Sequence, residues 1–137
     1  MAGHIFTFPY NYKNITEGKI LNPILTIPIK TKIGWLDTLF LLDSGADTTM
    51  LTLPMAKRLG LQFNLKQKTR LFGIGDIGVY AYAGQVTLKF NQRFELTVRC
   101  YYINAEDSTL LLGRLDVFDK FNIFFNTSNQ QVVFNPL

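Results

Sequence analysis

A short polar segment directly after an apolar run carries the residues best suited to chemistry. Residues 43–47 read Asp-Ser-Gly-Ala-Asp, and residues 39–42 before them are all apolar. A short, continuous apolar run of this kind predicts a β-strand that is buried on both faces. The glycine lets the loop backbone come close to another chain or a ligand. A carboxylate held in a fixed place with limited water, as expected for Asp43, can act as a general acid or base.

Aspartate in a loop more commonly caps a turn through its own side-chain oxygen. For Asp43 the surrounding sequence favours catalysis, because the apolar run precedes it and a second apolar run, residues 110–112, leads into Gly113 and Arg114. Turn capping is the alternative interpretation of this residue.

Most of the remaining chain has the patterning of short β-strands. Aromatic residues at positions 6, 8, 10 and 12 have period two, which predicts a strand or a docked extended arm. Pro23 and Pro28 place the next segment at a sheet edge or at a bulge. Strands are expected at residues 21–30, 35–42, 61–72, 79–83, 85–90, 94–103, 110–112, 122–126 and 131–134.

Two short helices are expected among these strands. The first begins after Thr52, a possible cap, and ends at Gly60. The second covers one or two turns within residues 114–121. Its apolar face would carry Leu115, Phe118 and Phe121. An apolar strand, a tight polar loop and a short helix therefore occur twice, and only the first copy carries the acidic pair.

A glycine cluster separates two of the predicted strands. Gly73, Gly75 and Gly78 match the spacing of a dinucleotide-binding fingerprint, which requires a helix to begin at the glycines. Residues 79–82 read Val-Tyr-Ala-Tyr, which is typical of a strand. The cluster therefore predicts the turn of a β-hairpin.

Length and composition predict one globular domain over residues 1–137, with residues 1–20 as an N-terminal extension or arm. Cys100 is the only cysteine and His4 the only histidine, so Cys–His and Ser–His–Asp catalysis are not expected. Cys100 lies in an apolar stretch and is expected to be a small buried hydrophobe.

The formal net charge of +4 is scattered along the chain. Its densest cluster, Lys66, Lys68 and Arg70, lacks the interleaved aromatic residues of a stacking surface, so we expect a solvated face and no nucleic-acid partner. No apolar run approaches the ~20 residues of a membrane span, and no signal peptide is evident. We expect a soluble, cytoplasmic protein without a membrane partner.

Three features in this order resemble the retropepsin family of aspartic proteases. Residues 41–48, Leu-Leu-Asp-Ser-Gly-Ala-Asp-Thr, are similar to its active-site motif, and residues 110–114, Leu-Leu-Leu-Gly-Arg, to its second signature. The glycine hairpin lies between them, where the family has its flap. Together these features cover roughly residues 20–137. The resemblance implies an all-β, closed barrel-like acid protease fold with a flap hairpin, one or two short helices and a two-fold homodimer.

The resemblance also implies roles for individual residues. Asp43 would be the catalytic aspartate, one from each subunit, and a peptide or protein would be the substrate. The active-site loop would be supported by Ser44, Gly45, Thr48 and Arg114, with Ser44 bonding across the dimer and Arg114 pairing with Asp47. Substrate would be contacted by Gly45, Ala46, Asp47, Gly73, Ile74 and Gly75, of which the last three lie near the flap tip. No metal or cofactor is implied.

Two departures leave the dimer interface open. About twenty residues precede the family-like region, and the C-terminal hairpin is longer than the single terminal strand of viral members. A non-catalytic dimeric module of the same fold, binding peptides or mediating assembly, is the alternative function. The intact Asp43-Ser44-Gly45 sequence argues against it.

Overall fold

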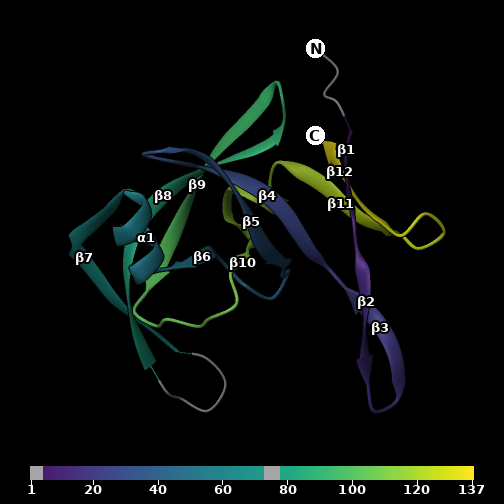
Figure 1. Ribbon diagram of the computed structural model, residues 1–137, viewed down its shortest axis with the longest axis horizontal. Helices are drawn as coiled ribbons and strands as arrows, with labels where there is room; N and C mark the ends of the chain where they lie inside the picture. Colours follow the sequence, from purple (N-terminus) through teal and green to yellow (C-terminus); the bar gives the residue numbers. More distant parts are fainter. Residues whose placement is uncertain (1–4, 73–77) are drawn as a thin grey trace.

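The computed structural model describes residues 5–72 and 78–137, and this part of the chain is mostly β-structure (Figure 1). The strands are β1 (Phe6–Pro9), β2 (Asn11–Ile15), β3 (Gly18–Asn22), β4 (Ile24–Thr31), β5 (Gly34–Leu42), β6 (Thr49–Thr52), β7 (Phe63–Phe72), β8 (Gly78–Asn91), β9 (Phe94–Ile103), β10 (Leu111–Leu112), β11 (Phe121–Asn126) and β12 (Gln131–Pro136). The helical elements in these residues are α1 (Leu53–Leu59) and the short segment η1 (Arg114–Phe118). Neither is long and apolar enough to cross a membrane.

The strands form a seven-stranded sheet, a three-stranded sheet and a two-stranded hairpin. The seven-stranded sheet has the order β4-β5-β10-β6-β9-β8-β7. β4 also pairs with β8, where Ile29 lies opposite Leu88, so the sheet curls back on itself like a partly closed barrel. The three-stranded sheet has the order β1-β12-β11, and β2 pairs with β3 alone among the described strands. β4 ends the strand order, but its pairing with β8 at Ile29, next to Pro28, means that the predicted edge position is confirmed only in part.

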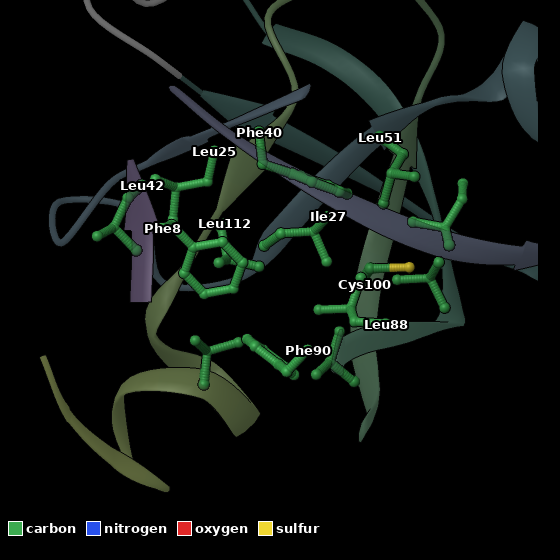
Figure 2. Packing of buried hydrophobic residues seen from close by; sticks show 14 of the residues in the cluster. Phe8, Leu25, Ile27, Phe40, Leu42, Leu51, Leu88, Phe90, Cys100 and Leu112 are labelled. Atoms are coloured by element: carbon green, nitrogen blue, oxygen red, sulfur yellow. The ribbon is translucent and has the colours of Figure 1, made fainter. Parts of the chain in front are cut away.

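A continuous apolar core lies inside the curled sheet (Figure 2). Leu25, Ile27 and Ile29 alternate along β4 and are completely buried, as are Phe40 of β5 and Leu88 of β8. Alternation of this kind places one face of each strand on the core and the other toward solvent.

Aromatic side chains attach the three-stranded sheet to this core. Phe6 of β1 lies opposite Phe134 of β12, and its ring is 5.6 Å from that of Phe90 in β8. Phe8 packs edge-on against Phe134 at 5.2 Å. The predicted docked strand is therefore confirmed for the first aromatic residues. The alternation ends at Tyr12, which is 42% exposed in β2.

The first predicted helix is confirmed with its caps. The hydroxyl of Thr52 accepts a hydrogen bond from the amide of Met55, and Pro54 occupies the first turn. Gly60 ends the helix with φ 69°, a left-handed conformation that glycine adopts without a steric penalty. The boundaries follow from signals within eight residues of one another, so the sequence alone was sufficient to predict them.

The prediction that residues 39–42 are buried on both faces is wrong. Phe40 and Leu42 are buried, but Leu39 is 61% exposed. Burial therefore alternates along this part of β5. At Leu39 the described residues cover only one face of the large sheet.

The second predicted helix is confirmed only in part, as the short segment η1, which a turn interrupts. Leu115 (φ −60°, ψ 130°) and Asp116 (φ 66°, ψ 0°) have the angles of a type II turn. Asp116 accepts hydrogen bonds from the backbone amide of Arg99 and from its guanidinium group, each at 2.9 Å. This contact with β9 stabilises the turn, and Phe121 already belongs to β11.

Other strand assignments differ from the predictions as well, and the strand expected at residues 21–30 is divided between the end of β3 and β4. β6 (Thr49–Thr52) was not among the expected strands. β8 is one strand of 14 residues that continues through Gly84, where two strands were predicted. A Cβ atom on Gly84 would lie 2.2 Å from the carbonyl oxygen of Gln62, so this glycine allows close backbone packing inside a strand.

Candidate active site

The candidate site lies where two parallel strands end side by side. Leu41 and Leu42 of β5 pair with Leu111 and Leu112 of β10. The amide of Asp43 then donates a hydrogen bond to the carbonyl of Leu112, at 3.1 Å. The two similar segments of the sequence are therefore neighbours in space, and Asp43 lies at the point where both strands stop.

The Asp43 carboxylate is oriented by its own loop. Its Oδ1 atom accepts a hydrogen bond from the amide of Gly45, at 2.8 Å, and the residue is half-buried. A Cβ atom at position 45 would lie 3.1 Å from the same oxygen, which is a tight contact. This hydrogen bond is the one expected of a turn cap. It also gives the carboxylate a fixed direction, which catalysis requires.

Backbone hydrogen bonds connect the loop to the segment after β10. The amide of Arg114 donates to the carbonyl of Ala46, and the amide of Leu115 donates to the carbonyl of Asp47, both at 2.9 Å. Ala46 is only 8% exposed, and its amide and carbonyl are both hydrogen-bonded within the loop region, so within one chain this residue offers a ligand little contact. The loop is consequently held by the second signature segment and not only by its own turn.

Arg114 and Asp47 also form an ion pair through their side chains, the pairing that the resemblance implied. The two side chains are 57% and 85% exposed. Exposed pairs contribute little to stability because water screens the charges. The effect of this pair is therefore to orient the Asp47 side chain at the rim of the loop.

Thr49 and Gly113 support the loop from inside, and neither was among the predicted site residues. Thr49 is completely buried, and its Oγ1 atom accepts a hydrogen bond from the amide of Gly113, at 3.1 Å. A Cβ atom on Gly113 would lie 2.4 Å from the carbonyl carbon of Thr48, so no larger residue fits without displacement. The Leu-Leu-Gly-Arg sequence signalled that the glycine had a role, but no local signal linked it to a residue 64 positions away.

The other predicted site residues are less closely defined. Ser44 is exposed and Thr48 is half-buried in the loop. Gly73, Ile74 and Gly75 lie outside the described residues. The strands on either side of them, β7 and β8, form an antiparallel pair in which Phe72 lies opposite Gly78.

The surroundings of the loop include one open hollow and a separate buried thiol. The hollow is lined by Asp47, Arg114, Leu115, Phe118 and Asp119.

Burial raises the pKa of the Cys100 thiol to about 12, which makes it a poor nucleophile at neutral pH. Within residues 5–72 and 78–137, no three His, Cys, Asp or Glu side chains are grouped closely enough to hold a metal ion.

The fold is similar to those of several solved proteases. EIAV protease, in a complex with the inhibitor HBY-793, is 27% identical over 68% of this chain and 82% of its own, with a TM-score of 0.52. A retropepsin-like aspartic protease from Rickettsia conorii is 14% identical over 96% of this chain and 98% of its own, with a TM-score of 0.60. The retroviral protease-like domain of Ddi1 from Leishmania major is 17% identical over 82% of this chain and 94% of its own, with a TM-score of 0.52.

No protein-family model matches the sequence, and no curated protein matches it significantly. The structural neighbours are nevertheless retropepsin-like aspartic proteases, so the resemblance indicated by the motifs is confirmed. The chain has the mostly-β retropepsin-like fold with few short helical segments.

Proposed function

We propose that this chain is an aspartic endopeptidase that acts as a homodimer, with residues 1–137 forming one protease domain. The observation that carries the proposal is the position of Asp43 at the joint end of β5 and β10, in a loop oriented by Gly45. The 27% identity with EIAV protease supports it.

One such loop per chain makes a second copy necessary for the chemistry. Two carboxylates a few ångströms apart cannot both ionise readily, so they share a proton and titrate as a pair. The ionised Asp43 takes a proton from a water held between the pair, and the protonated Asp43 polarises the carbonyl of the scissile peptide bond. A two-fold axis supplies the second Asp43 in an equivalent position.

The remaining site residues orient the substrate and the two loops. Ser44 is exposed at the loop, where its hydroxyl can bond to the partner's loop. Asp47, oriented by Arg114, accepts hydrogen bonds from the substrate backbone. The hairpin of β7 and β8 acts as the flap, with its tip at Gly73, Ile74 and Gly75, and excludes water from the reaction.

The substrate class follows from a channel between two subunits. An extended peptide can pair its backbone with strands on either side, while alternate side chains enter hollows. The hollow beside Asp47 and Arg114 contains Leu115 and Phe118, which would accept an apolar side chain. We therefore propose internal cleavage of extended peptides next to apolar residues.

The test is the substitution Asp43→Asn, with Asp37→Asn as the matched control. Asp37 is an exposed carboxylate on the same strand, β5. Purified wild-type protein and both variants would be incubated with a peptide library between pH 4 and 7. Asp43→Asn should abolish cleavage while circular dichroism stays unchanged, and Asp37→Asn should cleave like the wild type.

Full activity of Asp43→Asn would assign the activity to another residue and reject the proposal. A wild-type protein that binds peptides in this pH range without cleaving them would instead make a non-catalytic dimeric module the better account.

A further inference from the structure

We propose that the hairpin of β2 and β3 is a dimerisation arm that packs one face against a second copy of this chain. The inference rests on the proposed function, because only a dimer brings two Asp43 side chains together. We call residues 11–22 the hairpin arm.

The hairpin arm projects from the body of the molecule (Figure 1). Its two strands pair with each other and with no other described strand. All of β2 and the first three residues of β3 are exposed. A lone two-stranded hairpin is only marginally stable in water, so an arm of this kind is expected to gain stability from a contact.

One face of the arm is tied to its own subunit. Tyr12 lies opposite Leu21, and directly opposite residues in an antiparallel pair share a face. Leu21 packs against the core of the subunit. The Tyr12 ring contacts that of the buried Tyr10, with the centroids 5.8 Å apart.

The other face carries apolar side chains without such cover. Lys13 lies opposite Ile20, and Ile15 lies opposite Gly18, so both isoleucines share this second face. Ile15 is 38% and Ile20 is 42% exposed. The aliphatic part of Lys13 can extend the apolar surface while its ammonium group stays in water. This face is the one that a partner would cover.

The position of the arm identifies the partner as a second copy. Pro23, the residue after β3, accepts a hydrogen bond from the amide of Leu42 at 3.0 Å, and Leu42 immediately precedes Asp43. A shared proton requires two Asp43 carboxylates within hydrogen-bonding distance, so the two-fold axis must pass beside this loop. The arm therefore starts beside the axis.

The length of the arm then carries it onto the partner. A five-residue strand extends for about 16 Å, and although Leu21 packs on its own subunit, all of β2 and the first three residues of β3 remain exposed. Two-fold symmetry places the arm of each subunit on equivalent residues of the other.

The experiment measures dimer dissociation by analytical ultracentrifugation, which does not depend on catalysis. The variant is Ile15→Asp/Ile20→Asp, and the control is Ile33→Asp. Ile33 is 81% exposed in the β4–β5 turn, at the end of β4 away from the arm. The arm variant should raise the dimer Kd about tenfold or more, since two apolar side chains lose their burial. The control should leave the Kd unchanged, and both should keep the wild-type circular dichroism.

Hydrogen exchange of wild-type protein provides a second readout. Amides in residues 11–22 should be protected in the dimer and lose that protection on dilution to monomer. An unchanged Kd in the arm variant, or protection that does not depend on concentration, would reject the proposed role of the arm in dimerisation. Either result would remain compatible with a dimeric protease. Loss of dimer affinity in a protein without peptidase activity would support the arm and reject the proposed function. A wild-type protein that stays monomeric at high micromolar concentration would overturn both.

Discussion

The buried hydroxyl of Thr49 accepts a hydrogen bond from the amide of Gly113 at 3.1 Å, and this contact joins the two halves of the candidate site. Thr49 follows the Asp43 loop, and Gly113 follows β10. The loop geometry therefore depends on a donor and an acceptor that are both inaccessible to water.

Thr49→Val should destabilise the protein by about 1–3 kcal/mol, because it leaves the buried Gly113 amide without an acceptor. Urea unfolding followed by fluorescence measures the change. Thr97→Val is the control, since Thr97 bonds to Thr87 at an exposed position and should change stability by less than about 0.5 kcal/mol. Equal effects of the two substitutions would contradict a special role for Thr49.

Gly113→Ala should destabilise the protein by about 1–3 kcal/mol as well, through overpacking. The added Cβ atom would lie 2.4 Å from the Thr48 carbonyl carbon, and backbone cannot move aside as a flexible side chain can. The melting temperature and the peptidase activity should fall together. A variant with wild-type stability would show that the strand ends separate easily.

The ion pair between Arg99 and Asp116 should make stability depend on pH in the acid range. Hydrogen bonds from Arg99 lower the pKa of Asp116 from 3.8 to about 2. A lowered folded-state pKa stabilises the protein above the unfolded value near 4, and this contribution is lost as the pH falls from about 4 to 2.

Asp116→Asn tests this dependence without disturbing the turn, because asparagine tolerates the φ of 66° at this position. The wild type should be more stable than the variant by about 1 kcal/mol at pH 6, allowing for solvent screening at the exposed Arg99. Urea titrations should show this difference disappearing toward pH 2. A stability difference between wild type and variant that stays constant from pH 6 to pH 2 would show that the Arg99–Asp116 ion pair does not cause the pH dependence.

Arg114→Ala should affect function more than stability. The pair with Asp47 is exposed, while the backbone hydrogen bond from residue 114 to Ala46 remains in the variant. KM for a cleaved peptide should rise while the melting temperature changes by a few degrees at most, as measured by peptidase kinetics and thermal unfolding. Arg93→Ala, at an exposed turn, is the control and should change neither.

Cys100 should be unreactive in the folded protein. The residue is 2% exposed, and burial raises the pKa of its thiol to about 12. A thiol reagent such as Ellman's reagent at pH 8 should label the protein only after unfolding in urea, and peptidase activity should survive the treatment. Rapid labelling of the native protein would show that the core opens near β9.

Short-range features of this protein could be predicted from the sequence. The caps of α1 at Thr52 and Gly60 rest on residues close together in the chain. The polar loop after β5 was equally recognisable, because the order of residue types in residues 41–48 is itself the signal.

Tertiary structure alone decided the features that depend on distant neighbours. The parallel pairing of β5 with β10 brings the loop carbonyl of Ala46 to the amide of Arg114. A contact from β9 holds Asp116 in the turn that interrupts the second helical segment. The sequence determined which residues could form the site, because local preferences act over a few residues. Their arrangement required hydrogen bonds between strands more than sixty residues apart, for which no local preference exists.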